Sequence, residues 1–510
     1  MDDFIEYATT DNDTITHRTG SERCRIPLLI VSISAVIPLM AGCGGLGQWC
    51  HNGFKVGPTY TPATANVAES WVDASDPHLR GGAYDNACWW TAFGDPTLNR
   101  LVDQASQENL TLKEAGFRIL EARAERGIAT GNLFPQQQEA TGQYTRNAMS
   151  KNAYPFNAVP LPRYYYDNWS AGLDAAWELD FWGRFRRAVE AADAHLDAQV
   201  EGYDNVLVLL QAEVATNYIQ MRAYEERLQL ACKNVELQKE TLRIVTLREQ
   251  QGLVTELDVD QATTNLGATE SLIPTLQNGH RRAQNRLCVL MGEPPCRLTQ
   301  MIRSPGTIPL PPQEVVIGIP ADLLRRRPDV RQAERNAAAQ SARIGIAEAE
   351  FYPHIAITGT IGLQAEKASQ LFESSSLVGA IGPGFHWNIL NYCRIKNNVK
   401  AEEARFQQAL VNYRDLVLRA NEEVENGIAG FLTEQERVKS LDKSTRAAAR
   451  SVEIAMRQYE KGMISYQPLL DSERALVQQQ DSLTESRGLV GVNLVAVYRA
   501  LGGGWQARGT

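Results

Sequence analysis

The sequence predicts a mainly α-helical chain made of two structural repeats, each carrying two β-strands, and three observations support this. Identical residues recur at a constant spacing of 210 positions: Trp177 and Trp387, Arg184 and Arg394, Gly252 and Gly462. Self-similarity at a fixed spacing indicates a duplicated structural unit. Each copy also holds a very long stretch without proline, and two short segments in which apolar and polar residues alternate. Long helices and paired strands are expected from these two patterns.

The N-terminal residues 1–42 are predicted to be an export signal. Three arginines between positions 18 and 25 precede the apolar run IPLLIVSISAVIPLMAG, which ends at Cys43. A basic region, an apolar core and small residues at its end are typical of secretory signals. The stretch LMAGC is similar to a bacterial lipobox, which implies cleavage before Cys43 and a diacylglycerol and fatty acyl lipid on this residue. The alternative is a plain secretory signal with Cys43 unmodified. Residues 43–88 are then expected to form a lipid-anchored N-terminal tether, of which the stretch CGGLGQWCHNG at 43–53 is flexible.

The first repeat is predicted at 89–295 and the second at 326–505, joined by a proline-rich linker at 296–325. Each repeat contains a helix that ends at an aromatic residue and a proline, Phe134-Pro135 in the first copy and Tyr352-Pro353 in the second. Proline cannot continue a helix interior, so it marks the end of the helix.

Alternation predicts four β-strands, at about 136–150, 167–180, 354–364 and 377–390. Small, apolar and aromatic residues that alternate with polar ones suit a membrane strand. The smallest membrane barrels need about eight strands, so four strands cannot close one. Either the sheet is soluble, or several chains contribute strands to one barrel.

Helical hairpins are predicted at about 184–291 and about 394–501. The first arm of each hairpin lacks proline and would extend about 100 Å at 1.5 Å per residue. Helices of this length are typical of coiled coils and helical barrels. Gly252 and Gly462 break the two hairpins at equivalent positions, and a helix returns after each glycine.

Charge and motif content exclude several function classes. The net charge of -9 and a pI near 5.5 argue against binding nucleic acid. Glu350 and His354 are four residues apart, but Pro353 separates them, and no second histidine completes a metal-site pattern. Walker, HExxH and GxSxG motifs are absent from the sequence, so we expect no enzyme activity, metal or cofactor.

Several stretches, taken in order, resemble the TolC family of outer-membrane efflux proteins, and more closely its NodT/OprM-type lipoprotein branch. These stretches are FKVGPTY, WWTAFGDPTLNRLVDQA, LDAAWELDFWGRFRRAVEAA, IPADLLRRRPDVRQAE and AEAEFYPHIAITG. The resemblance spans Cys43 to Trp505. It implies a homotrimer in the outer membrane, in which three chains of four strands form a 12-stranded β-barrel. The long helices would then form an α-helical barrel across the periplasm, with the linker near its equator.

The resemblance also implies roles for residues at the hairpin ends. The turn residues would contact a periplasmic membrane-fusion adaptor: Gly252, Leu253, Val254, Gly462, Met463 and Ser465. Asp471 and Tyr459 match residues of the periplasmic gate. Asp258 and Asp260 lie near the same level on the first hairpin and are assigned to the gate with them. Family members often carry two aspartates three positions apart after the second turn. Asp471 matches the second of these, whereas Pro468 replaces the first.

The function implied is that of a passive conduit that exports drugs, toxic compounds or metals from the periplasm, together with a pump of the resistance-nodulation-division (RND) type. One alternative is a type I conduit for protein secretion with the same fold. Another is a coiled-coil lipoprotein that forms no channel, with the strands in a soluble sheet.

Overall fold

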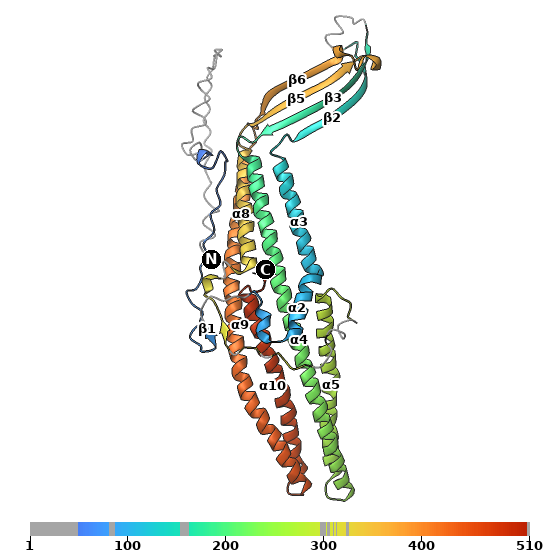
Figure 1. Cartoon of the computed structure of the whole chain (residues 1–510), viewed down its shortest axis with the longest axis vertical. Coiled ribbons are helices and arrows are strands. Elements are labelled where there is room, and N and C mark those ends of the chain that lie inside the picture. The colour runs from blue at the N-terminus through green and yellow to red at the C-terminus, as the bar shows by residue number, and fades with distance from the viewer. Residues whose placement is uncertain are drawn as a thin grey trace, which may run out of the picture. The chain divides into compact units, whose positions relative to one another are not determined.

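Two long helical hairpins and one four-stranded sheet dominate the part of the chain that the computed structural model describes (Figure 1). The described residues are 49–80, 87–152, 163–295, 302, 306–309, 311–312, 314–322 and 326–506. The chain divides into two compact units, Met1–His51 and Asn52–Thr510, and the architecture below is that of the second. The predicted signal, Cys43 and much of the linker lie outside the described residues.

The duplication extends to whole elements of equal length. Three pairs match: α3 (Leu110–Gly131) and α8 (Pro328–Ala349) with 22 residues, α4 (Arg184–Gln250) and α9 (Arg394–Glu460) with 67, and α5 (Glu256–Leu290) and α10 (Tyr466–Ala500) with 35. At 1.5 Å per residue, the two longest helices extend about 100 Å. α4 packs against both α5 and α10, so the two hairpins share a long contact.

The sheet contains β2 (Gln137–Ala148), β3 (Tyr165–Leu179), β5 (His354–Ala365) and β6 (Leu377–His386), in that order. All neighbours are antiparallel, and the central pair joins the two repeats. β6 ends four residues before the predicted position 390. There the chain turns into α9, with positive φ at Tyr392 and Cys393, and the Trp387 side chain donates a hydrogen bond to the Phe351 carbonyl at 3.0 Å.

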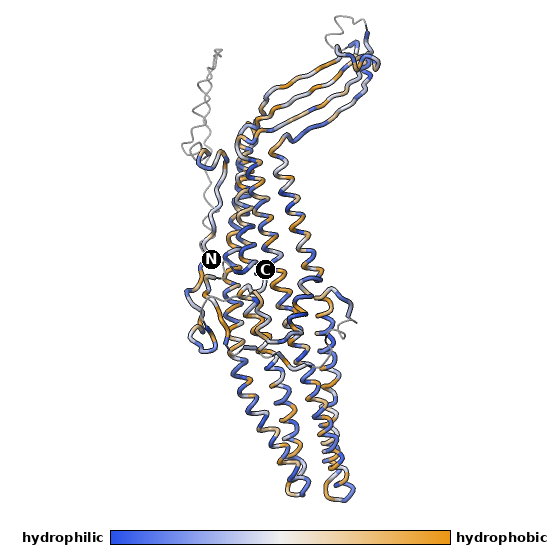
Figure 2. The backbone as a smooth tube through the Cα atoms, viewed as in Figure 1, coloured by the Kyte–Doolittle hydropathy of each residue, from blue (hydrophilic) through white to orange (hydrophobic). Residues whose placement is uncertain are grey.

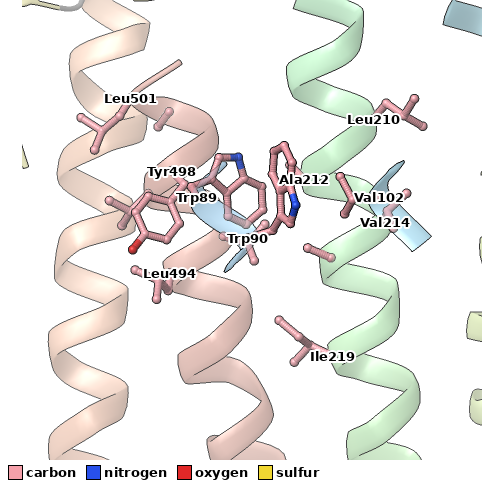
Figure 3. Close-up of a cluster of buried hydrophobic side chains, with 14 of the residues drawn as sticks. Trp89, Trp90, Val102, Leu210, Ala212, Val214, Ile219, Leu494, Tyr498 and Leu501 are labelled. Carbon is pink, nitrogen blue, oxygen red and sulfur yellow. The ribbon is translucent and has the colours of Figure 1, made fainter. Parts of the chain in front are cut away.

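The main core lies between α4 and α10, where a tryptophan-rich segment inserts (Figure 3). Trp89 stacks on Tyr498 with 5.3 Å between ring centroids and meets Trp90 edge-on at 5.8 Å. Aromatic pairs at such distances contribute beyond their buried area. α2 (Pro96–Glu108) follows directly and buries Leu98 and Leu101 in the same core.

Residues 54–80, which follow the stretch predicted to be flexible, pack against the rest of the second unit. Trp71 is buried and donates its indole hydrogen to the Gly318 carbonyl at 2.8 Å. β1 (Leu79–Arg80) then pairs in parallel with β4 (Val315–Val316). The sequence did not predict these contacts because they join segments more than 200 residues apart, which local composition does not reveal.

Hydrophobic and hydrophilic residues alternate along the helices and strands (Figure 2). Among the helices of the described residues, none combines the length and the apolar character needed to cross a membrane.

Candidate functional site

Each hairpin ends in the same tight turn, centred on the glycine that the sequence singled out. Gly252 has φ of 72° and Gly462 has φ of 70°. The glycine amides donate to the carbonyls of Glu249 and Tyr459, and the next amides donate to the carbonyls of Arg248 and Gln458, all at 2.8 or 2.9 Å. This is the Schellman pattern of helix ends, in which glycine adopts the left-handed conformation without a steric cost.

The residues predicted to contact an adaptor lie at these two turns. Leu253 is 66% exposed and Met463 is 70% exposed. Ser465 is exposed and directly precedes α10, whereas Val254 is half-buried against the residues below the turn. Both turns lie at the same end of the second unit (Figure 1).

A small apolar core just behind the turns joins the two hairpins, and we call it the tip cluster. Its buried members are Val245, Ala262, Ala455, Tyr459, Tyr466, Leu469 and Leu470. They come from α4, α5, α9 and α10, so the cluster connects all four helices.

Tyr459, the predicted gate tyrosine, is 1% exposed and sits inside the tip cluster. The Arg248 guanidinium of the other hairpin lies 4.5 Å from the centroid of its ring and donates to the Glu460 carbonyl at 3.2 Å. Burial raises the pKa of Tyr459 above its usual value. The cross-hairpin contact at this tyrosine is therefore a cation–π interaction, which contributes most where water is excluded.

The three predicted gate carboxylates are not equivalent in the structure. Asp471 is exposed and accepts a hydrogen bond from the Gln467 amide at 3.0 Å, and Asp260 is also exposed. Asp258 instead accepts from the Thr255 amide at 3.1 Å and from the Thr255 hydroxyl at 3.2 Å, which caps the start of α5. Its carboxylate therefore has a structural role that the sequence analysis did not assign.

Pro468 occupies the first turn of α10, where helical amides have no partner within the helix. Proline is tolerated at such a position because it removes no helical hydrogen bond. The departure from the family pattern at this residue therefore leaves the helix intact.

A buried polar layer lies between the tip cluster and the main core, and we call it the polar seam. Its members are each at most 6% exposed: Asn234, Gln238 and Thr241 of α4, Asn265 and Thr269 of α5, and Glu473 of α10. Glu473 accepts hydrogen bonds from Thr241 Oγ1 at 2.5 Å and from Asn265 Nδ2 at 3.1 Å. Burial raises the pKa of Glu473 above its usual value, although both hydrogen bonds lower it.

The sequence analysis missed Glu473, although its spacing carries a signal. The residue lies three positions after Leu470 and three before Leu476, on the apolar stripe of α10. A carboxylate on such a stripe is either buried or at the border of the contact. Only the packing of α4 and α5 shows that it is buried.

At the other end of the helices, residues 53–57 form an N-terminal strap across the start of α4. Arg187, 3% exposed, donates to the carbonyls of Val56 and Gly57 at 2.9 Å each and pairs with Glu190 at 2.7 Å. Lys55 forms a second ion pair with Glu190. Burial raises the pKa of Glu190, but the hydrogen bonds from Lys55 and Arg187 outweigh it, so the net shift is downward.

His354, which the sequence analysis excluded as a metal ligand, lies beside two carboxylates. Its Nδ1 is 2.7 Å from Glu178 Oε1 and its Nε2 is 3.5 Å from Glu350 Oε2, and Arg184 pairs with both carboxylates. Throughout the described ranges, no group of three or more His, Cys, Asp or Glu is placed to hold a metal ion.

Comparison with known proteins gives a consistent result. The model of the family "Outer membrane efflux protein" matches residues 101–293 and 319–503. The chain is 28% identical over 441 residues to Nodulation protein T of Rhizobium leguminosarum bv. trifolii, covering 85% of this chain and 91% of that protein. It is 26% identical to the probable outer membrane lipoprotein SilC of Salmonella typhimurium, covering 94% and 99% of the two chains. Among solved structures, the outer-membrane channel OprN matches with a TM-score of 0.81 and 34% identity, covering 88% of this chain and 99% of that one.

Proposed function

The chain belongs to the outer membrane efflux protein family, and from this premise we propose that three copies of it form a passive conduit across the outer membrane. In this proposal the conduit works with a periplasmic membrane-fusion adaptor and an inner-membrane RND-type pump. It exports small molecules such as drugs, toxic compounds or metals. The observation that carries the proposal is the pattern of side chains on the two faces of the sheet.

One face of the sheet is apolar and the other is polar. Register places Leu173, Ile361 and Gly379 side by side on one face, as it does Leu179, Ile355 and Phe385. The opposite face carries polar residues: Glu139, Thr141, Gln143, Ser170, Asp174, Thr358, Thr360 and Gln364. Ile381 and Phe385 are 83% and 75% exposed. An apolar outer face and a polar lumen are the pattern of a membrane strand.

The strand lengths and the open edges support a shared barrel. The strands hold 10 to 15 residues, and about 9 to 11 tilted residues cross a bilayer. Within the described residues, β2 and β6 each have a neighbour on one side only. Unpaired strand edges are costly in lipid, so β6 of one copy is expected to pair with β2 of the next, which gives 12 strands in three copies.

The strap supports a lipid anchor on Cys43, which itself lies outside the described residues. Arg186 donates to the carbonyls of Gly53 and Phe54 at 2.7 and 2.8 Å, and α4 begins five residues after β3 ends. The strap is thus fixed beside the sheet end of the helices. Ten residues separate Cys43 from Gly53, and an extended chain of that length reaches about 35 Å.

The opposite end of the second unit suits the adaptor and the gate. The exposed Leu253 and Met463 side chains offer apolar contacts on two rigid turns of the same geometry. Exposed large apolar residues that cluster at one place are typical of protein interaction sites. Asp471 and Asp260 are free of ion pairs among the described residues, so three copies could bring their charges together as a ring that favours cations.

Planar-bilayer conductance of the detergent-extracted protein, with native mass spectrometry on the same sample, tests the proposal. We expect a trimer with a small, cation-biased conductance. A monomer without conductance would leave only the coiled-coil lipoprotein. Export of a cargo protein, rather than of a dye or metal, in cells that also contain the adaptor and pump would favour the type I secretion conduit.

A further inference from the structure

Glu473 is the one carboxylate in the polar seam, and it joins the two hairpins. It belongs to α10, whereas both of its hydrogen-bond partners belong to the other hairpin, Thr241 on α4 and Asn265 on α5. The residue is 1% exposed. Its contacts therefore exist only while the two hairpins stay together at this level.

The hydrogen bonds around Thr241 fit a neutral Glu473 better than an ionised one. Thr241 Oγ1 lies 2.5 Å from Glu473 Oε1 and 3.2 Å from the Leu237 carbonyl. A hydroxyl has one hydrogen to donate, so it cannot serve two acceptors at once. If Glu473 carries a proton on Oε1, it donates to Thr241, and Thr241 donates to Leu237. Asn265 then donates to Oε2, and every group is satisfied.

The charged and titratable groups nearby do not supply a counter-ion to an ionised Glu473. From α4 and α5 the groups that contact it are the neutral side chains of Thr241 and Asn265. On its own helix, Arg474 turns to Asn265 Oδ1 at 3.4 Å. Tyr466 of α10 also lies near enough to interact with Glu473, and it carries no positive charge.

We propose that Glu473 is a proton-dependent latch between the hairpins, which closes the tip as a neutral acid and releases it on ionisation. The step is an acid dissociation in which the O–H bond of Oε1 breaks and the proton passes to water that enters the seam. The proposal rests on the conduit function argued above, because it concerns the opening of the same tip.

The direction of the pH dependence follows from burial. The packed seam raises the pKa of Glu473, whereas an opened seam lets water solvate the carboxylate and brings the pKa back toward its usual value. The closed state thus holds the proton more tightly. Protonation of Glu473 stabilises the closed state in full at a pH below the ordinary carboxyl pKa, and this stabilisation is lost as the pH rises through the raised pKa. Each unit of difference between the two pKa values biases the equilibrium by up to tenfold per chain.

The test compares the conductance of the wild type with that of Glu473→Gln from about pH 4 to about pH 9, a range that spans the ordinary carboxyl pKa and values above it. A glutamine amide can donate to Thr241 and accept from Asn265, as the neutral acid does, so the variant should fold. We expect the open fraction of the wild type to rise with pH by up to about tenfold for each unit by which burial raises the pKa, and that of the variant to stay low and flat. Glu485→Gln, which removes an exposed carboxylate of the same helix outside the predicted gate, is the matched control and should keep the wild-type response to pH.

Infrared difference spectra provide a readout that does not depend on a channel. The carbonyl band of a protonated carboxylic acid that the wild type shows and Glu473→Gln lacks should persist above the pH at which exposed carboxyl groups ionise, and fade as the pH rises further. Loss of this band at the same pH as the exposed carboxyl groups overturns the proposal, as does a variant whose conductance responds to pH like the wild type. If the band appears but the protein never conducts, Glu473 is a neutral acid as proposed, whereas the proposed conduit function is refuted.

Discussion

Replacing Arg187 with methionine should release the N-terminal strap while leaving the helices intact. Methionine keeps most of the length of the side chain but removes two hydrogen bonds to the carbonyls of Val56 and Gly57 and the pair with Glu190. A hydrogen bond to a charged group contributes about 1.5 to 3 kcal/mol. At the low end of this range, the loss of two such bonds lowers the free energy of strap opening by about 3 kcal/mol. The equilibrium constant for opening then rises about 100-fold.

Hydrogen exchange measured by mass spectrometry on peptides that cover residues 54–57 reports this opening directly. The Val56 amide donates to the Trp182 carbonyl at 3.0 Å and exchanges only when the strap lifts. We expect about 100-fold faster exchange in Arg187→Met, since exchange follows the free energy of opening. Arg118→Met is the matched control, because Arg118 forms an exposed pair with Glu114 worth about 0.3 to 0.5 kcal/mol. Strap exchange that stays within about threefold of the wild type in both variants would refute the assignment of the strap to Arg187.

Four further substitutions test the strap, the turn, the anchor and the gate. Gly57→Ala should loosen the strap because the added Cβ would lie 2.4 Å from Gly345 Cα. The Cβ of Gly252→Ala would meet nothing within 4 Å, so this variant should lose only about 1 kcal/mol of stability, because of its positive φ. Equal losses of thermal stability in the two variants would contradict this contrast. Cys43→Ser should abolish labelling with radioactive palmitate but preserve the trimer, and persistent labelling would count against the lipid site. Asp471→Ala should raise the conductance at the tip, and an unchanged conductance would place the gate elsewhere.

The repeats and the hairpins could be predicted from the sequence because their causes are local. A stretch without proline, followed by a glycine that can adopt positive φ, determines where a long helix ends and turns. Arg184 and Arg394, the predicted first residues of the hairpins, are the first residues of α4 and α9. Alternation likewise located four strands, and the TolC-like fold that the resemblance implied is confirmed by the similarity to the OprN channel.

The contacts that position the site could not be predicted, because they depend on partners distant in sequence. Thr241 and Asn265 lie 232 and 208 positions from Glu473, and Arg187 lies 131 positions from Val56. Helical spacing places a residue on a face, but it does not say which helix covers that face. The predicted gate carboxylates show the same limit, since their level along the hairpins grouped Asp258 with Asp471 although Asp258 caps a helix.

The distribution of apolar and polar contacts along the two hairpins indicates which part can move. The main core around Trp89 holds the hairpins with large aromatic side chains, whose separation would expose apolar surface at about 25 cal/mol per Å². The polar seam is held by hydrogen bonds, each with a net value of only about 1 kcal/mol because water can replace the partner. We therefore expect the hairpins to separate at the seam and to stay joined at the core. The tip cluster and the contact of Arg248 with Tyr459 then form the remaining apolar and cation–π barrier to opening. Glu473 lies directly behind this barrier, so under the proposed latch the loss of its proton would weaken the barrier most.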